Sequence, residues 1–417
     1  MFGPEFGHGK PLVREPLLAA LEALGAPHAS LAPVIHVAGA NGKGSTIAFM
    51  RAIAEAAGLK VHAFTKPHLL RLNERFVVAS KIASDDVLIA AAQRVHAVAP
   101  DLTQFDAQVA AAFLLFGKTP ADVVLLETGM GGRDDSTNVI AAPALAVITP
   151  IGLDHQDALG VTLAEIAAHK AGILKPNASA IIARQPDEVR EVIEACAERI
   201  GAPLCRQGVE WDAYASNGRL VVQTETRALD LPLPSLHGAH QVDNAGLACA
   251  ALLQWREFAD DAFAAGVADA HWPARLQPLT RGPFSAPIRA IGGEVWIDGG
   301  HNAHATAALC RWAASAAKER RAPLVVVFGA RARKDWGIAL KALALIAERI
   351  IAVPIAEGVD PESLAAYSLS EGAAAITAPS LAAAMQNAAQ LPAPRVLICG
   401  SFLLAAEALA AESAQEA

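Results

Sequence analysis

The chain has 417 residues, which exceeds the length of one typical domain, so we expect two domains. Hydrophobic residues make up 53% of the sequence and charged residues 18%, a composition that favours a large folded core and argues against a disordered chain. The formal net charge is −8 and no dense run of Lys or Arg is present, which argues against nucleic acid as the main partner.

Targeting signals and redox chemistry are also constrained by the sequence. The first ten residues contain no apolar signal core, and the most apolar stretches, such as residues 110–116, are too short to span a bilayer. The five cysteines lack the spacing of a metal site, and buried reduced thiols are the simplest interpretation: Cys196, Cys205, Cys249, Cys310 and Cys399. We therefore expect a cytoplasmic protein with no membrane partner.

The most informative segment is HVAGANGKGST at residues 36–46, which follows an apolar run and precedes a helix expected to begin at Ile47. A glycine-rich turn between a strand and a helix presents backbone N–H groups and the positive end of the helix dipole to phosphate. Lys43 is placed to reach the terminal phosphates, and a hydroxyl to reach a metal or a phosphate. The predicted nucleotide-contacting residues are Gly39, Asn41, Gly42, Lys43, Gly44, Ser45 and Thr46.

Short β-rich runs alternate with Ala/Leu-rich helical stretches, which predicts βαβ units and a mainly parallel sheet. The first candidate strands are Val34–Val37, Val61–Phe64, Val123–Glu127, Leu145–Thr149 and Ala178–Ala183. Notable residues follow the strand ends, the edge at which open α/β sheets bind ligands. Glu127 ends one apolar strand, so its carboxylate suits a metal ligand, with a salt-bridge partner or helix-dipole contact as the alternative.

The pattern changes at residues 205–235, where alternation predicts a short antiparallel hairpin, and it breaks again at residues 271–273. Beyond that break a second set of strands is predicted: Val295–Asp298, Leu324–Phe328, Arg349–Val353, Ala374–Thr377 and Arg395–Cys399. The fold class is therefore α/β, with a P-loop ATPase-type, mainly parallel sheet domain at residues 1–271. A smaller Rossmann-like α/β domain follows at residues 272–417.

Ordered blocks along nearly the whole chain resemble the folylpolyglutamate synthase/dihydrofolate synthase branch of the Mur ligase family. PHLLRLNER points to the folate branch and not to the cell-wall branch. The blocks are HVAGANGKGST at 36–46, TKPHLLRLNERF at 65–76, LLETGMGGRDDSTNVI at 125–140, ITPIGLDHQDALG at 148–160, IAAHKAGILKP at 166–176, LHGAHQVDNA at 236–245, WPARLQ at 272–277, IDGGHNAHA at 297–305 and GARARKD at 329–335.

The resemblance implies an ATP-dependent amide ligase. ATP phosphorylates a carboxylate of dihydropteroate or of a reduced folate, and the amino group of L-glutamate attacks the resulting acyl phosphate. The first domain then corresponds to the ATP-binding central domain of Mur ligases and the second to their glutamate-ligase domain. We expect a monomer whose two domains hinge near residues 272–275 and close over ATP. The alternative is a nucleotide-binding Mur-type protein with weak or altered ligase activity.

The same resemblance assigns metal ligands. Two Mg²⁺ ions are expected, since the charge of a transferring phosphoryl group must be spread. Their ligands are expected to be Ser45, Glu127, His155 and Lys170. Lys170 matches a lysine that the family commonly carries as a carbamate, which requires a neutral amine and is helped by burial. An unmodified Lys170 that touches phosphate is the alternative.

Nucleotide and catalytic roles follow in the same way. Asn244 matches the adenine edge of the site, although alone it could cap a helix. Arg275 matches a phosphate-contacting arginine, and Asp298 and His301 are expected to reach ribose and the reacting phosphate. The residues expected to carry catalysis are Lys43, Lys170, Asp298 and His301.

The folate-side loop is expected to include Pro67, His68 and Arg75, with Asp154 as a further substrate contact. Arg75 could pair with a substrate carboxylate or form a structural ion pair with Glu74 or Asp135. Lys334-Asp335 could contact glutamate or be a solvated charge pair.

Three positions depart from the family pattern. Lys66 stands where a serine usually helps to hold the first Mg²⁺, and a protonated lysine has no lone pair with which to ligate. Water could replace the missing ligand, Lys66 could meet phosphate directly, or the loop could turn it away. Asp134 replaces a leucine and Ala303 a proline, and we expect both changes to be tolerated.

Overall fold

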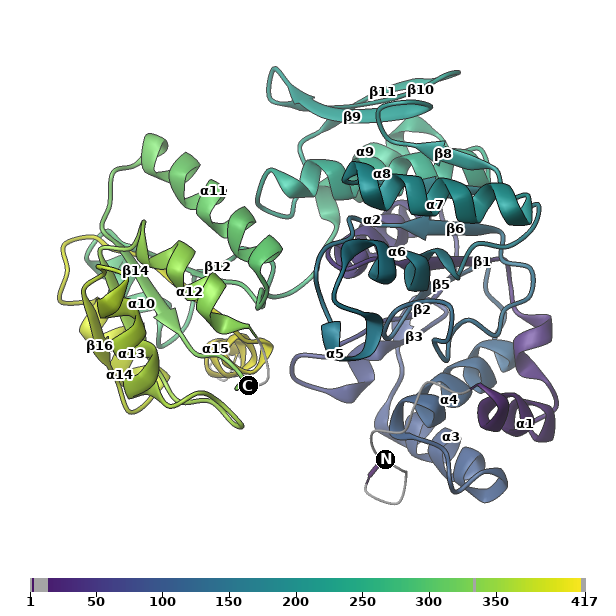
Figure 1. The fold of residues 1–417 in the computed structure, drawn as a ribbon, viewed down its shortest axis with the longest axis horizontal. Helices are drawn as coiled ribbons and strands as arrows, with labels where there is room; N and C mark the ends of the chain where they lie inside the picture. Colours follow the sequence, from purple (N-terminus) through teal and green to yellow (C-terminus); the bar gives the residue numbers. More distant parts are fainter. Residues whose placement is uncertain (1, 4–13, 333–334, 414–417) are drawn as a thin grey trace. The chain divides into compact units, whose positions relative to one another are not determined.

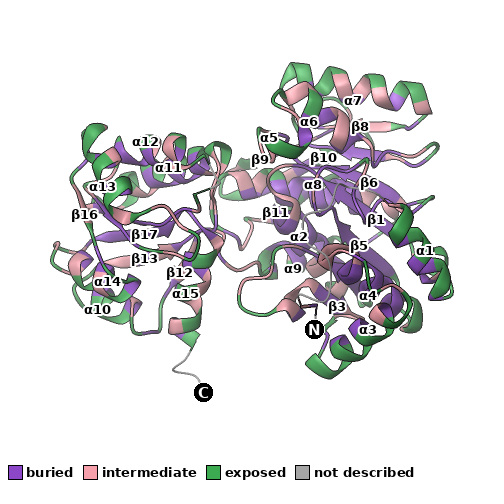
Figure 2. Ribbon diagram, turned by 60° about the horizontal axis from the view of Figure 1, so that its bottom comes forward, coloured by how far each residue is buried: buried purple, intermediate pink, exposed green. Residues whose placement is uncertain are grey.

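The computed structural model describes residues 2–3, 14–332 and 335–413, and the chain forms two compact units (Figure 1). The first unit comprises residues 1–235 and 241–271, and the second comprises residues 236–240 and 272–417. Each unit is built around its own sheet, whose central strands are buried, while the outward faces of the helices are exposed (Figure 2).

An eight-stranded sheet forms the centre of the first unit, in the order β4-β3-β2-β5-β1-β6-β7-β8. The six strands from β2 to β8 in this order are parallel, and β3 and β4 extend one edge through antiparallel pairings. Their bounds are β1 Val34–Ala38, β2 Val61–Phe64, β3 Phe76–Val78, β4 Lys81–Ile82, β5 Val123–Glu127, β6 Leu145–Ile148, β7 Ala180–Ile182 and β8 Leu204–Arg206. The parallel α/β class predicted from the alternating pattern is confirmed.

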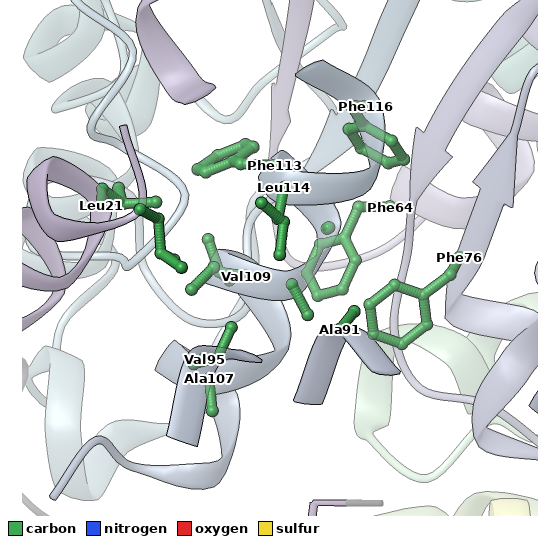
Figure 3. Close-up of a cluster of buried hydrophobic side chains, with 14 of the residues drawn as sticks. Leu21, Phe64, Phe76, Ala91, Val95, Ala107, Val109, Phe113, Leu114 and Phe116 are labelled. Atoms are coloured by element: carbon green, nitrogen blue, oxygen red, sulfur yellow. The ribbon is translucent and has the colours of Figure 1, made fainter. Parts of the chain in front are cut away.

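Helices flank this sheet and bury apolar side chains against it or against one another. They are α1 Glu15–Ala23, α2 Lys43–Ala56, α3 Asp85–Val98, α4 Gln104–Lys118, α5 Gln156–Leu159, α6 Leu163–Ala171, α7 Asp187–Ile200, α8 His240–Trp255 and α9 Asp260–Asp269. Short 3₁₀ turns lie at Pro27–Ser30 and Leu72–Arg75. One cluster joins α1, α3 and α4 to the sheet, where Phe64 and Phe76 meet edge to face with ring centroids 5.3 Å apart (Figure 3).

The segment expected to be a hairpin is instead a three-stranded antiparallel sheet, in the order β11-β10-β9. The strands are β9 Trp211–Ser216, β10 Arg219–Thr224 and β11 Ala228–Pro232. The third strand, ALDLP, was not predicted, and it ends at the start of a proline-containing run. Proline is tolerated here because Pro232 lies at the end of an edge strand.

The second unit contains a six-stranded sheet in the order β12-β13-β17-β14-β15-β16, parallel except for β12. The strands are β12 Gln277–Leu279, β13 Glu294–Ile297, β14 Leu324–Phe328, β15 Arg349–Ala352, β16 Ala375–Thr377 and β17 Arg395–Cys399. The helices are α10 Ser285–Ala290, α11 Ala303–Glu319, α12 Trp336–Ala344, α13 Pro361–Ser370, α14 Leu381–Ala388 and α15 Phe402–Ser413.

No helix in the described part of the chain is both long enough and apolar enough to cross a membrane.

Candidate active site

The carboxyl ends of β2, β5, β1 and β6 form one edge of the first sheet, and the glycine loop leaves this edge between β1 and α2. The helix begins at Lys43, four residues before the start expected at Ile47, so Ser45 and Thr46 lie in its first turn. The earlier start follows from Gly42, whose φ of +87° caps the helix and whose carbonyl accepts the Thr46 N–H at 2.8 Å. The first-turn amides are thereby directed at the loop, as an anion site requires.

Two glycines of the loop are required by close packing. A Cβ on Gly39 would lie 1.9 Å from the Thr149 hydroxyl oxygen, and a Cβ on Gly42 would lie 2.4 Å from Asn244 Oδ1. Asn244 is itself fixed, since its amide donates to Gln241 Oε1 at 2.9 Å. The loop therefore rests on β6 and α8, which brings Asn244 beside the predicted nucleotide site.

Lysine side chains converge on this loop. The ammonium groups of Lys43 and Lys170 both donate to the Gly39 carbonyl oxygen, at 2.9 and 2.8 Å. Burial, followed by repulsion from Lys43, lowers the pKa of Lys170 to about 7. The same two causes lower the pKa of Lys66 to about 8. The cluster is therefore electropositive, and the charged forms of Lys66 and Lys170 are disfavoured unless an anion binds beside them.

Glu127 faces the lysines from the end of β5. Its side chain is buried, its Oε2 accepts the backbone N–H of Lys66 at 3.0 Å, and its Oε1 lies 3.9 Å from the Lys43 ammonium nitrogen. The salt-bridge alternative for Glu127 is thus realised in part. The Lys66–Pro67 peptide bond is cis.

Buried hydroxyl groups complete the loop surroundings. The hydroxyl oxygens of Thr46 and Thr149 are buried and have no hydrogen-bond partner among the described residues. Ser45 is buried too, with a long contact of 3.5 Å from the Gln241 amide. Thr149 was not predicted as a site residue, although a hydroxyl residue at the carboxyl end of an apolar strand is a signal for one.

His155 lies next to Asp154 in the sequence and contacts it through both backbone and side chain. It has left-handed backbone geometry, its N–H donates to Asp154 Oδ1 at 3.0 Å, and its Nε2 lies 3.7 Å from Asp154 Oδ2. The Asp154 charge reaches the lysine cluster, where it opposes the fall in the pKa of Lys66 and Lys170. No group of three or more His, Cys, Asp or Glu side chains in the described ranges is arranged to hold a metal.

The predicted folate-side loop is internally bonded. Glu74 accepts the backbone N–H groups of Leu69, Leu70 and Arg71 at 2.7–2.9 Å. Arg75 donates to His68 Nδ1 at 3.0 Å and to Gln108 Oε1 at 2.7 Å.

Arg75 was expected either to bind a substrate carboxylate or to form an ion pair with Glu74 or Asp135, and its observed hydrogen bonds go to other side chains. The acceptors of Arg75 are neutral side chains, because Glu74 is engaged with the backbone and Asp135 accepts from Met130 and Thr137. Pro67 is exposed at the start of this loop.

In the second unit, Asp298 follows β13 directly and is buried. Its Oδ2 accepts the Leu276 N–H at 2.9 Å and its Oδ1 accepts the Gly300 N–H at 2.6 Å. Burial raises the pKa of Asp298, an effect that the Arg275 charge opposes. The Asp298 carboxylate thus joins the loop that carries His301, through Gly300, to the separate segment at Leu276.

Two departures from the family pattern are accommodated locally. Asp134 pairs with Arg133 at 2.9 Å and lies 3.6 Å from His169 Nδ1. Ala303 opens α11, where the preceding Asn302 side chain caps the helix by accepting the Ala305 N–H at 2.9 Å. Lys334 lies outside the described residues, and Asp335 precedes α12.

Comparison with known proteins identifies the family. Residues 37–252 match the Mur ligase middle domain and residues 287–402 match the Mur ligase glutamate ligase domain. The dihydrofolate synthase/folylpolyglutamate synthase of Bacillus subtilis is 36% identical over 338 residues, which cover 76% of this chain and 75% of that protein. The corresponding Escherichia coli protein is 32% identical, covering 88% of this chain and 84% of the relative.

Solved structures agree. E. coli FolC in complex with DHPP and ADP superposes with a TM-score of 0.88 at 30% identity, covering 98% of this chain and 96% of the other. A bifunctional folylpolyglutamate synthase/dihydrofolate synthase from Yersinia pestis, complexed with AMPPNP and Mn ion, gives a TM-score of 0.86 at 29% identity, covering 97% and 94%. The chain therefore belongs to the Mur ligase family, in its folylpolyglutamate synthase/dihydrofolate synthase branch.

Proposed function

We propose that this chain uses ATP to join L-glutamate to dihydropteroate and to the glutamate tail of reduced folates, with release of ADP and phosphate. The observation that carries the proposal is the meeting of Lys43, Lys170 and buried Glu127 at a glycine loop on one sheet edge, where Glu127 also accepts the backbone N–H of Lys66. Names of the relatives support the reaction, and a related structure was solved with Mn, AMPPNP and L-glutamate bound.

The phosphate groups of ATP occupy the glycine loop in this proposal. The first-turn amides of α2 and the Lys43 ammonium bind the phosphoryl oxygens, so Lys43 leaves the Gly39 carbonyl for a stronger, charge-assisted contact. The substrate carboxylate attacks the terminal phosphorus, the bond to ADP breaks, and an acyl phosphate forms. Glutamate then attacks with a neutral amino group, and phosphate leaves as the amine loses a proton. The lysines stabilise negative charge in both steps.

A metal ion fits this site if substrate phosphates and water supply the rest of its coordination sphere. Mg²⁺ is usually held by one or two carboxylates together with substrate phosphates and waters, so the absence of a three-ligand group among described residues is compatible with it. We assign Ser45 and Glu127 to one ion and His155 and Lys170 to a second. The unpartnered hydroxyl of Thr46 is a further oxygen in the same turn. Bound metal spreads the charge of the transferring phosphoryl group.

Lys170 is proposed to act as a carbamate. Its buried amine has a pKa of about 7, so a neutral fraction is available to attack CO₂, and the product carries an anionic oxygen pair in place of a cation. The carbamate is too labile for its added mass of about 44 Da to be measured reliably on the intact protein. Labelling with ¹³C-bicarbonate and detection by NMR is therefore the better measurement. A Lys170→Ala variant whose rate recovers with acetate supports a carbamate, whereas recovery with methylamine supports a phosphate-contacting ammonium.

The remaining assignments concern recognition. Asn244 is assigned to the adenine, Arg275 to phosphate, and Asp298 and His301 to the ribose and reacting phosphate. Asp298 also holds the His301 loop through the Gly300 N–H and ties it to the segment at Leu276.

Pro67, His68, Arg75 and Asp154 are assigned to the pterin-bearing substrate. Arg75 is half-buried and anchored by neutral partners, so its charge remains available to a substrate carboxylate. The chain is proposed to act as a monomer.

A second candidate function is nucleotide binding with weak ligation, favoured by Lys66. Its ammonium is repelled by Lys43, and a divalent cation close by would be repelled as well. The deciding experiment measures phosphate release from ATP with L-glutamate plus either dihydropteroate or tetrahydrofolate. Glutamate-dependent release with a pterin acceptor supports the ligase, and ATP binding without such release supports the second candidate. Turnover with a UDP-sugar peptide alone would move the chain to the cell-wall branch.

A further inference from the structure

Phe402 occupies a junction between two loops of the second unit. It opens α15 immediately after β17, and β17 pairs in parallel with β13, which leads to Asp298 and His301. The loops at the carboxyl ends of these strands are joined, because the Gly400 N–H donates to the Gly300 carbonyl at 3.2 Å. A half-buried aromatic ring is therefore placed beside the predicted nucleotide-contacting groups of this unit.

One phenyl ring contacts two charged or titratable groups from separate chain segments. The guanidinium carbon of Arg275 lies 4.9 Å from the Phe402 ring centroid, within the range of a cation–π interaction. The imidazole of His301 meets the same ring with centroids 5.6 Å apart and planes inclined at 60°. The ring thus links the position of Arg275 to that of His301.

Gly299 shows how tightly this arrangement is packed. A Cβ at residue 299 would lie 2.4 Å from the Phe402 ring and 3.2 Å from Arg275 Nη1. The Ala274 carbonyl accepts from both the Gly299 N–H, at 2.9 Å, and Arg275 Nη1, at 3.2 Å. Ring, guanidinium and loop backbone are therefore in mutual contact, so a substitution that removes the ring removes a support of the other two.

A ring face is a suitable support for an arginine that must bind an anion. An aromatic face attracts the guanidinium without using any of its N–H donors, whereas a carboxylate would occupy them in pairs. A phenyl group also has few rotatable bonds, so little conformational freedom is lost when it holds a neighbour in place.

We propose that Phe402 is a positioning residue of the ligase reaction, which sets the orientation of Arg275 and His301 toward the nucleotide. This inference rests on the proposed function, in which Arg275 and His301 contact the phosphate groups of ATP. Phe402 itself touches neither substrate nor reacting atoms in the proposal.

The test compares Phe402→Leu, which removes the π face, with Phe402→Tyr, which keeps it. Phe402→Leu is expected to lower kcat/KM for ATP about tenfold and to leave KM for L-glutamate within twofold of the wild-type value. Phe402→Tyr is expected to keep most of the wild-type kcat/KM for ATP. The control is Leu403→Ala, the next residue of the same helix, whose side chain is 38% exposed and which should leave the rate unchanged.

Two further measurements separate positioning from a general effect on folding. In an Arg275→Met background, adding Phe402→Leu should lower kcat/KM by less than a further twofold, because the group to be positioned is already lost. ADP affinity, measured by titration without any acceptor, should fall in Phe402→Leu and recover in Phe402→Tyr.

Wild-type rates and ADP affinity in both Phe402 variants would overturn the inference. So would equal losses in Leu and Tyr, or full additivity with Arg275→Met. Failure of the proposed function is distinguishable, since it is read from wild-type protein that binds ADP but releases no phosphate in response to glutamate.

Discussion

Replacing Gly42 by alanine separates backbone strain from a specific steric conflict at the nucleotide site. Gly42 has φ +87° and precedes α2, and Gly58 has φ +80° and follows the same helix. A Cβ on Gly42 would lie 2.4 Å from Asn244 Oδ1, whereas a Cβ on Gly58 would meet nothing within 4 Å. Gly58→Ala therefore measures the cost of the left-handed conformation alone, and it is the matched control.

The expected magnitudes follow from these contacts. A left-handed conformation costs an alanine roughly 1–2 kcal/mol, so Gly58→Ala should lower the free energy of unfolding by about that amount. Gly42→Ala should incur the same strain and must also displace the Asn244 amide from Gln241, a buried hydrogen bond of 2.9 Å whose loss costs about 1–3 kcal/mol. We expect Gly42→Ala to be the more destabilising variant by about 1–3 kcal/mol.

The assays are urea unfolding of both variants and titration with ATP. Gly42→Ala should weaken ATP binding at least tenfold, since both the loop and Asn244 are displaced, and Gly58→Ala should leave binding unchanged. Asn244→Ala removes the conflicting oxygen, so in the Gly42→Ala background it should be less destabilising than in the wild-type background. Equal unfolding free energies for the two glycine variants, with normal ATP affinity in Gly42→Ala, would refute this account of the loop.

Four further outcomes are expected. Glu127→Gln should lower kcat at least about a hundredfold because it removes the charge opposite Lys43, and a near-normal rate would show that the phosphate site is misplaced. Lys66→Ser should reduce the Mg²⁺ concentration for half-maximal rate about tenfold, and a higher requirement would contradict the repulsion argument. Glu412→Ala should destabilise the second unit by about 3 kcal/mol in urea unfolding, since its carboxylate accepts two backbone N–H groups and a hydroxyl at 2.7–2.9 Å. Burial lowers the pKa of His36 to about 3, so between pH 6.5 and 3 only the unfolded chain binds a proton at this residue. As the pH is lowered through that window, the free energy of unfolding should fall by on the order of 4 kcal/mol in wild type and by less in His36→Asn.

The parts of the fold that the sequence predicts are those determined locally. Val61–Phe64, Val123–Glu127, Leu324–Phe328 and Arg395–Cys399 were predicted with their observed bounds, because continuous apolar runs identify buried parallel strands. The edge strands β4, β8 and β12, and β3 next to the edge, were not predicted. Each has only two or three residues, so the pattern is too short to read, and their pairing depends on a neighbour distant in sequence.

The same distinction applies to the site. The glycine loop was visible in the sequence because eleven consecutive residues carry it. Phe402 was not visible as a functional residue, because its contacts with Arg275 and His301 span more than 100 residues. Thr149 was missed for the same reason, since only the β1–β6 pairing brings its hydroxyl beside Gly39.

The shared Gly39 carbonyl connects these observations to catalysis. One oxygen accepts from both Lys43 and Lys170, an arrangement in which two ammonium groups repel each other at short range. Either a phosphate that draws Lys43 away or a carbamate that removes the charge of Lys170 relieves the repulsion. A carbamate would also place a negative charge beside Lys43 and Lys66, and so would offset the repulsion that we expect Lys66 to exert on a metal. In that case Lys66 and a carbamylated Lys170 would be compatible within one active site, because the modification of the second would balance the charge introduced by the first.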